Sequence, residues 1–365
     1  MAMTLCGLTI TYLTITSTLL SLTHAATTLK LNRHITGSSA IQRKINALAK
    51  RDDLPLDTAS SRGVSYTVDV RIGNDGSSIP VIVDTGSDQF WVASTACGIC
   101  SAGGMTSSVL EAPQGCTRHS IQYGLGEVSG CVDHTSLMVG EYTVDGLHVL
   151  GVTDVDEHIL SDGQYMSGIW GICRNGATVD GSPTAVSLMY TQGLIKSPTV
   201  GFYLGRDGDG TDSEMTIGDV SALPYTNTDK KVTLPSHDNP NHLNEVTIDS
   251  ITINGKDLGE KIVAVIDTRS TGISTPEPLI GEVYSALFDG VAYKYANDYV
   301  IPLDFPMEAR DIVGQPIEDN YGWCYGLFVP LFHGTEFMVI GDAFLHNVYH
   351  TVNVDRGDVT FYALS

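Results

Sequence analysis

Short runs of apolar and β-branched residues, broken by Gly, Asn, Asp and Pro, dominate the pattern along the chain. Val, Ile, Thr and Tyr are common, and 38 of the 365 residues are glycine. Runs of this length and composition are typical of strands that end at turns. The pattern therefore predicts a mostly β protein, and the chain is long enough to form two lobes.

One stretch of this pattern occurs twice. VIVDTGS at 81–87 and AVIDTRS at 264–270 each place an Asp at the end of an apolar run, directly before a turn. Downstream of each lies an apolar-apolar-Gly triplet, which is IWG at 169–171 and VIG at 339–341. The repeat predicts two similar lobes related by a pseudo-twofold axis, with the two Asp-bearing turns face to face.

The first 25 residues contain no Lys, Arg, Asp or Glu and end in small residues. We interpret residues 1–25 as a secretory signal peptide that is cleaved after Ala25. The alternative is a membrane anchor, although Thr and Ser interrupt the apolar run and no basic residue precedes it. No later segment is apolar enough over a sufficient length to span a bilayer.

Residues 26–51 form a basic leader with six Lys and Arg, no acidic residue, and a Lys50-Arg51 pair at its end. The remaining chain has 14 Lys and Arg against 42 Asp and Glu, a net charge of −28. We interpret 26–51 as a pro-segment that docks through charge complementarity and that low pH loosens. The alternative is a flexible basic tail. The predicted organisation continues with a linker at 52–63 and lobes at 64–218 and 219–365.

This acidic body is a poor nucleic-acid binder, because attraction to phosphate requires positive charge. Once the signal is removed no membrane attachment is expected, and nothing in the sequence indicates an obligate oligomer, so we expect a monomer.

Secretion would permit disulfides among the six cysteines that follow the signal. The CxxC motif lacks a second CxxC or a nearby His pair, so a local Cys97–Cys100 disulfide or a bond to Cys116 is favoured over a metal site. Cys116 and Cys131 flank Gly124 almost symmetrically, as the foot of a hairpin would. The connectivity stays open.

Four motifs in order make the chain resemble the pepsin family of aspartic proteases. These are VIVDTGSDQFWV (81–92), SIQYGLGEVSG (120–130), SGIWGI (167–172) and VIGDAFLHNVYHTVNVDRGDVTFY (339–362). The resemblance covers residue 64 to the C-terminus and implies a bilobal fold with a cleft between two β-barrel-like lobes and a flap hairpin. In that comparison Cys324 is similar to the family's second-lobe cysteine, and Cys173 is expected to be a buried free thiol.

The resemblance implies an Asp84 and Asp267 catalytic dyad, with no metal and no organic cofactor. Two carboxyls in close contact cannot both ionise cheaply, so they share one proton, and aspartic proteases are the standard example of this effect. One group then activates a water and the other donates a proton. Further implied roles are hydrogen bonds that support the dyad, from Thr85, Gly86, Ser87, Thr268 and Ser270.

The motif around residue 123 implies a flap over the substrate. Its glycines, Gly124 and Gly126, suit a hairpin tip. Tyr123 is expected to reach towards the cleft, and Trp91 to brace it. The alternative for Tyr123 is an exposed strand tyrosine, and for Trp91 a core residue. The substrate would lie as an added strand beneath the flap.

Arg269 departs from the family, which has glycine at this position, as Gly86 does in the first copy. A guanidinium close to both aspartates would favour two ionised carboxylates and remove the shared proton. The alternative is a side chain that leaves the cleft and pairs with surface acids.

Taken together, the motifs, the leader and the acidic body predict a secreted, extracellular or vacuolar, aspartic endopeptidase that is made as a zymogen, is favoured by acidic pH and acts on polypeptides. The alternative function is an inactive homologue that binds peptides or a partner protein.

Overall fold

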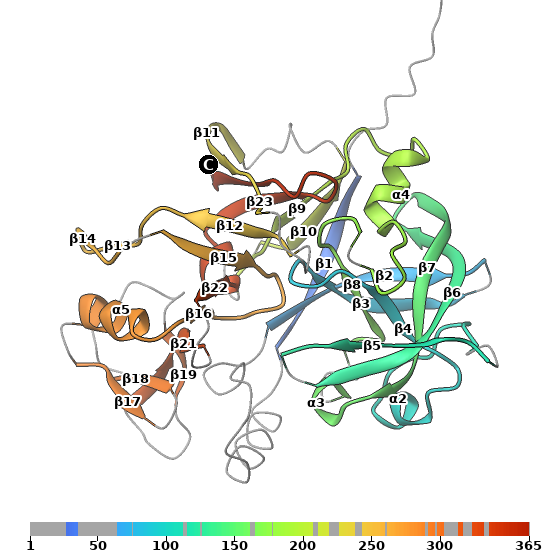
Figure 1. Ribbon diagram of the computed structural model, residues 1–365, viewed down its shortest axis with the longest axis horizontal. Helices are drawn as coiled ribbons and strands as arrows, with labels where there is room; N and C mark the ends of the chain where they lie inside the picture. Colours follow the sequence, from blue (N-terminus) through green and yellow to red (C-terminus); the bar gives the residue numbers. More distant parts are fainter. Residues whose placement is uncertain are drawn as a thin grey trace, which may run out of the picture.

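The computed structural model describes 16 stretches of the chain, and the rest lies outside this account. They are residues 27–35, 64–74, 76–111, 115–124, 126–160, 165–176, 178–206, 211–218, 226–237, 243–259, 261–288, 291–295, 298–302, 313–316, 323–331 and 336–364. Strands dominate them, so the predicted mostly β, bilobal pepsin-like fold is confirmed (Figure 1). None of the described helices is both long and apolar enough to cross a membrane.

The first half of the chain contains ten strands and three short helices among the described residues. The strands are β1 (Thr27–Ile35), β2 (Val64–Ile72), β3 (Ser78–Asp84), β4 (Phe90–Ala93), β5 (Arg118–Gln122), β6 (Glu127–Val139), β7 (Tyr142–Val155), β8 (Gly168–Gly171), β9 (Thr199–Tyr203) and β10 (Ser213–Ile217). The helices are α2 (Gly98–Ala102), α3 (Glu157–Leu160) and α4 (Ala185–Thr191).

The second half contains smaller sheets and two described helices. Its strands are β11 (Thr226–Leu234), β12 (Glu245–Ile248), β13 (Thr252–Ile253), β14 (Lys256–Asp257), β15 (Ile262–Ile266), β16 (Ile273–Thr275), β17 (Tyr293–Tyr295), β18 (Asp298–Pro302), β19 (Val313–Pro316), β20 (Trp323–Gly326), β21 (Phe328–Pro330), β22 (Phe337–Ile340), β23 (Val348–Asn353) and β24 (Val359–Leu364). The helices are α5 (Leu279–Phe288) and α6 (Asp342–Leu345).

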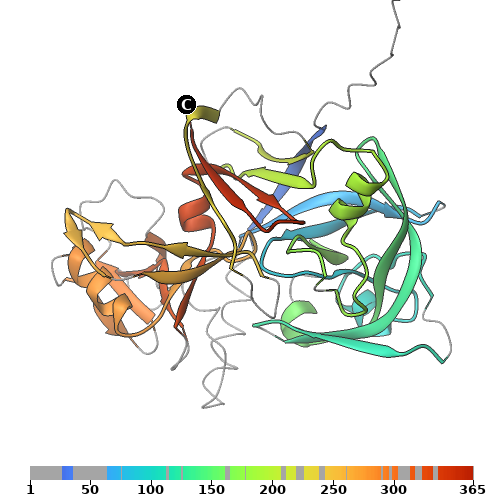
Figure 2. The same cartoon turned by 45° about the horizontal axis from the view of Figure 1, so that its top comes forward.

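A 13-stranded sheet runs through the molecule in the order β11-β24-β23-β9-β10-β1-β2-β3-β8-β4-β7-β6-β5. The second half adds a five-stranded sheet (β12-β15-β22-β16-β21) and a four-stranded sheet (β17-β18-β20-β19). In both views the two halves, blue to green and orange to red, lie side by side (Figures 1 and 2). The strands β9, β10, β23 and β24, from both halves, lie next to one another in the large sheet and join the lobes.

The sequence repeat corresponds to a repeat of strand pairing. In the first half β3 pairs in parallel with β8, and Asp84 lies opposite Gly171. In the second half β15 pairs in parallel with β22, and the Asp267 N–H donates to the Ile340 carbonyl at 3.0 Å. Each apolar-apolar-Gly triplet therefore lies beside the strand that leads to an aspartate, which ends β3 in the first half and follows β15 in the second.

The glycine that ends each triplet is required by close packing. A Cβ at Gly171 would lie 2.6 Å from the backbone of Asp88, and one at Gly341 would lie 1.9 Å from the Ser270 carbonyl oxygen. In both lobes the turn that follows the aspartate crosses directly over this glycine. The repeated Gly thus lets the Asp-bearing turn pack against its neighbouring strand.

Strand β1 comes from the stretch that we interpret as a pro-segment. It pairs antiparallel with β10 on one side and β2 on the other, and Leu31 is buried. Lys30 forms an ion pair with Asp212 at 2.9 Å, although both side chains are largely exposed and such pairs stabilise little. The predicted signal (1–25), the rest of the pro-segment and the linker (52–63) lie outside the described residues.

Most buried apolar side chains form one core that extends through both halves. A second, smaller cluster lies beneath β5 and β6, and Trp91 and Tyr123 belong to it together with Val128, Ile159 and Ile169. Because this cluster is separate from the main core, the flap hairpin has its own apolar support.

Candidate active site

The two Asp-bearing turns make the same set of hydrogen bonds. In the first, the Gly86 N–H donates to Asp84 Oδ1 at 2.8 Å, and the Ser87 hydroxyl donates to Oδ2 at 2.7 Å. In the second, the Arg269 N–H donates to Asp267 Oδ1 at 2.8 Å, and the Ser270 hydroxyl donates to Oδ2 at 2.7 Å. Each carboxyl is therefore held by one backbone and one hydroxyl donor.

Two buried threonines bind the turns to each other. The Thr85 N–H donates to Thr268 Oγ1 at 3.2 Å, and the Thr268 N–H donates to Thr85 Oγ1 at 3.0 Å. Each hydroxyl then donates to a carbonyl of the opposite lobe, Thr85 to Ile266 at 2.8 Å and Thr268 to Val83 at 2.9 Å. These four bonds cross the boundary between the lobes directly beneath the aspartates.

Gly86 shows how closely the turns approach. A Cβ on this residue would lie 2.6 Å from Asp267 Cγ and 2.8 and 2.9 Å from its two oxygens. Such separations are shorter than van der Waals contact allows, so any side chain would displace the carboxyl. The two aspartates, which are far apart in the sequence, thus belong to a single site.

Asp84 is 3 % exposed, and its environment favours the protonated form. Burial is the largest cause, and the charge of Asp267 adds to it, so that the pKa of Asp84 rises from 3.8 to about 7. Arg269 and the hydrogen bonds from Ser87 and Gly86 act in the opposite direction but are outweighed. The site can therefore retain one proton well above the pH at which an ordinary Asp loses it.

The flap is the β5–β6 hairpin. The Tyr123 N–H donates to the Gly126 carbonyl at 2.9 Å and closes the tip, where Gly126 has a φ of +90°. Tyr123 is 9 % exposed, and its hydroxyl accepts a hydrogen bond from Trp91 Nε1 at 2.8 Å. Burial and the charge of Asp84 raise the pKa of Tyr123, so the ring belongs to the same electrostatic site. Gly124 lies exposed at the tip, beside a residue outside the described part.

The side chain of Arg269 lies against the flap tyrosine. Its guanidinium carbon lies 5.2 Å from the centroid of the Tyr123 ring, at the distance of a cation–π contact. The side chain therefore reaches from the Asp267 turn to the flap. It lowers the pKa of Asp84, but burial and Asp267 have the larger effect, so it does not remove the preference for a proton.

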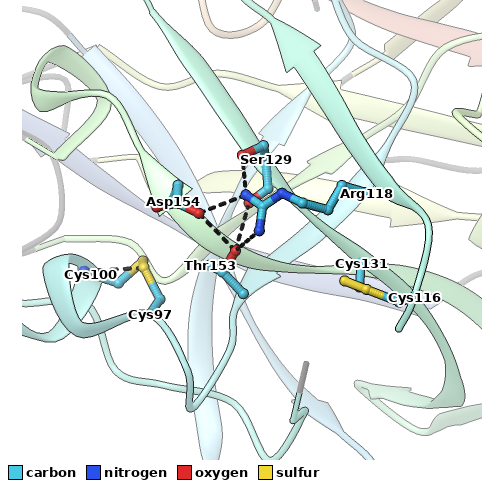
Figure 3. Close-up of polar contacts among 8 residues, drawn as sticks. All are labelled: Cys97, Cys100, Cys116, Arg118, Ser129, Cys131, Thr153 and Asp154. Carbon is cyan, nitrogen blue, oxygen red and sulfur yellow. Dashed lines mark hydrogen bonds and ion pairs between the residues drawn. A yellow bond between two sulfur atoms is a disulfide. The ribbon is translucent and has the colours of Figure 1, made fainter. Parts of the chain in front are cut away.

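The base of the flap is held by two cysteines that the sequence placed at the foot of a hairpin, and by an arginine that the sequence analysis did not identify. A Cys116–Cys131 disulfide joins the start of the hairpin to β6. Arg118 on β5 donates to Ser129 at 2.7 Å and Thr153 at 3.1 Å and pairs with Asp154 at 2.7 Å, so three strands are joined (Figure 3). The spacing of the two cysteines in the sequence indicated the disulfide, whereas a lone arginine in a strand does not indicate which residues it will contact.

Residues behind the Asp84 turn form a second supporting layer. The buried side-chain amide of Asn244 donates to the Thr85 carbonyl at 2.9 Å and to the Ile172 carbonyl at 3.0 Å. Cys173 is the buried free thiol expected from the sequence, and it donates to the same Thr85 carbonyl at 3.1 Å. The Asn244 contacts could not be read from the sequence, because Asn244 comes from the other half of the chain.

Asp342 is a third carboxyl near the site. It directly follows Gly341, is fully buried, and within the described residues its side-chain oxygens have no hydrogen-bond partner. Burial, with the charge of Asp267 as a smaller cause, raises the pKa of Asp342 well above its usual value. The group is therefore held in its neutral form. The feature of the sequence that could have identified Asp342 is an acidic residue immediately after the repeated glycine.

The cysteine alternatives are resolved in favour of local pairs. Cys97 and Cys100 form a disulfide at the start of α2, and Cys116 bonds to Cys131 rather than to either of them (Figure 3). The side chain of Cys324 lies outside the described residues. In the described part of the chain no group of three or more His, Cys, Asp or Glu side chains is placed to hold a metal ion.

Comparison with known proteins gives consistent matches over most of the chain. Residues 65–364 match the family model described as eukaryotic aspartyl protease. Rhizopuspepsin-4 of Rhizopus niveus is 25 % identical over 321 residues, covering 81 % of this chain and 76 % of the relative. Probable vacuolar protease A of Arthroderma benhamiae is 24 % identical over 350 residues, with 85 % and 83 % covered. Rhizopuspepsin-2 of Rhizopus niveus is 27 % identical over 320 residues, with 81 % and 78 % covered. With a family match of this extent on a bilobal fold, the chain belongs to the eukaryotic aspartyl protease family.

Proposed function

We propose that the protein is an aspartic endopeptidase that hydrolyses internal bonds of extended polypeptides, with Asp84 and Asp267 as its catalytic dyad. The observation that carries the proposal is the paired arrangement of the two carboxyls. They stand on touching turns with matching donors, and the pKa of one is raised to about 7. An acid and a base held side by side are what amide hydrolysis requires.

In the proposed reaction the ionised carboxyl takes a proton from a water held between the two groups. The oxygen of that water bonds to the scissile carbonyl carbon, and the protonated carboxyl supplies a proton to the carbonyl oxygen. Proton transfer to the nitrogen then lets the C–N bond break. Tyr123 and the flap would cover the substrate and exclude bulk water during these steps.

The proposal includes synthesis as a zymogen, favoured by acidic pH. Leader residues 27–35 form a central strand, and Lys30 pairs with Asp212, which supports docking of the basic segment on the acidic body. Acidification protonates carboxylates and weakens such docking. Secretion is proposed from the first 25 residues, and the relative named Probable vacuolar protease A makes a vacuole the alternative destination.

The direct test is proteolysis by the purified chain that starts at residue 26. After acid incubation, the protein is mixed with denatured globin at pH 2.5 to 6, with and without pepstatin. We expect fragments that pepstatin suppresses and that Asp84→Asn and Asp267→Asn abolish. Lys261→Gln, a change at an exposed side chain of the second lobe, is the matched control and keeps full activity.

A second candidate function is peptide binding without turnover, and the contact between Arg269 and Tyr123 favours it. A side chain that extends from one wall of the cleft to the flap occupies space that a substrate needs. If no fragments form at any pH, yet the purified protein retains pepstatin, the binding function replaces the enzymatic one.

A further inference from the structure

The tip of the flap lies directly against the side chain of Asp156. A Cβ on Gly126 would lie 2.7 Å from Asp156 Cβ and 2.8 Å from its Cγ, which is closer than van der Waals contact allows. Gly126 also has a φ of +90°, a conformation that favours glycine. Beside it, the Asp156 N–H donates to the Glu127 carbonyl at 2.9 Å. One residue thus supports the tip through both packing and a backbone hydrogen bond.

Asp156 is itself held by the first turn of α3. Its Oδ1 accepts a hydrogen bond from the backbone N–H of His158 at 2.9 Å and lies 2.7 Å from Nδ1 of the same side chain. Its carbonyl accepts from the N–H groups of Ile159 and Leu160 at 3.1 and 3.0 Å. Asp156 therefore caps α3. Ile159 is 1 % exposed and shares the smaller apolar cluster with Tyr123, so the helix is anchored beneath the flap.

The contact at Gly126 is passed on to Tyr123 through the closed tip of the hairpin. The Tyr123 N–H donates to the Gly126 carbonyl at 2.9 Å. The side-chain amide of Gln122 donates to the carbonyls of both residues at 3.1 Å. Because these three bonds close the tip into one unit, a shift of Gly126 would also move the backbone of Tyr123.

We propose that Asp156 is a positioning residue of the cleft, which supports Gly126 and thereby sets the place of the Tyr123 ring. The inference rests on the proposed function, since it states how the flap of that same site is held over a peptide. Asp156 acts through the flap and not by contact with the substrate. The bonds from His158 keep the supporting side chain in one orientation.

The test begins with Asp156→Ala, which removes the carboxyl group that Gly126 packs against and that caps α3. In the ligand-free protein we expect amide hydrogen exchange of the Tyr123 N–H to become about ten-fold faster, because local opening is easier. With a capped peptide taken from a cleaved site of globin we expect KM to rise about ten-fold and kcat to change little, because enclosure by the flap favours the bound substrate and its transition state alike. Asp156→Asn keeps the shape and an acceptor oxygen, and should restore both values.

Thr184→Ala is the matched control for the loss of a helix cap. The Thr184 side chain accepts a hydrogen bond from the Ser187 N–H at 3.4 Å and caps α4, which lies away from β5 and α3 (Figure 1). This control should lower the Tm about as much as Asp156→Ala, yet leave the exchange of Tyr123 and the KM unchanged. If Asp156→Ala also leaves the exchange unchanged, Asp156 is only a helix cap and the inference is overturned.

Amide exchange separates this inference from the proposed function, because it requires no turnover. If the wild type cleaves no peptide but Asp156→Ala speeds the exchange of Tyr123 and Asp156→Asn does not, the support of the flap stands and the protease proposal fails. If the wild type cleaves the peptide and Asp156→Ala has the same KM as the wild type, the protease proposal stands and the positioning role is rejected.

Discussion

The Asp84 turn and the Asp267 turn have the same hydrogen bonds but differ in burial and in their third residue. Asp84 is almost fully buried and Asp267 is half-buried. The first turn has glycine, and a Cβ there would contact the opposite carboxyl at 2.6 Å. The second turn accommodates the Cβ of an arginine and directs its side chain to the flap.

This difference shows that a pseudo-twofold repeat can preserve its hydrogen bonds without preserving its steric constraints. The backbone donors to the aspartates are the same whether the third residue is Gly86 or Arg269, because they require only an N–H at that position. The room for a side chain at that position, however, depends on which groups of the other lobe and the flap lie nearby. The two positions are therefore expected to respond differently to the same kinds of substitution.

The largest expected effect is on the pH dependence of stability and comes from the more buried aspartate. The folded-state pKa of Asp84 is about 7 against 3.8, so its contribution to stability is complete below about pH 3.8 and is lost as the pH rises through 7. The loss is about 4 kcal/mol. Asp84→Asn should remove most of this decline, measured as the Tm at pH 4 and pH 7.5.

Asp267→Asn is the matched comparison, because it removes only the like charge and leaves the burial of Asp84 in place. The Asp267→Asn variant should therefore still show part of the decrease in Tm between pH 4 and pH 7.5. If Asp84→Asn and the wild type show the same change in Tm between the two pH values, Asp84 does not carry the proton.

Gly86→Ala tests the steric difference. Its methyl group would displace the Asp267 carboxyl, and a misplacement of about 1 Å costs on the order of 100-fold in kcat/KM. Gly98→Ala is the control, since a Cβ there meets nothing within 4 Å. Globin hydrolysis measures both. Full activity of Gly86→Ala would mean that the lobes can move apart at the site.

The threonine bonds test whether the two turns contribute equally. Thr85→Val and Thr268→Val each remove a hydroxyl while nearly keeping the shape of the side chain. Each leaves its buried partners in the opposite lobe without a hydrogen bond, which lowers the free energy of unfolding by about 1–3 kcal/mol. We expect similar decreases in Tm for the two variants. We also expect the double variant to lose less than the sum, because both hydroxyls belong to one network. Additive losses would show that the lobes are joined by independent bonds.

The smallest expected effect is a shift of the pH profile of activity. Arg269 and the Ser87 hydroxyl both lower the pKa of Asp84, so Arg269→Gly and Ser87→Ala should each move the alkaline limb of kcat/KM to higher pH. Lys261→Gln should leave it in place. A limb that moves to lower pH in Arg269→Gly would show that the cation stabilises the protonated dyad instead.

The duplicated motif explains why so much of the fold was predictable. Strand pairing such as β3 with β8 and β15 with β22 follows from apolar runs that both need a buried partner. By contrast, the Arg118 network and the Asn244 contacts join residues from distant parts of the chain. Their side chains are ordinary for a surface strand or a loop, so no local pattern distinguishes them.

By itself the sequence determined the strand-rich class, the two-lobed repeat and the identity of the paired aspartates, because hydrophobic periodicity and a repeated motif are local properties. Only the tertiary structure decided where the Arg269 side chain lies. From the sequence the side chain could lie near the dyad or pair with surface acids, and only the structure shows that its guanidinium lies over the Tyr123 ring. That choice depends on the charges and aromatic faces which folding brings within a few ångströms, and a linear sequence does not contain those distances.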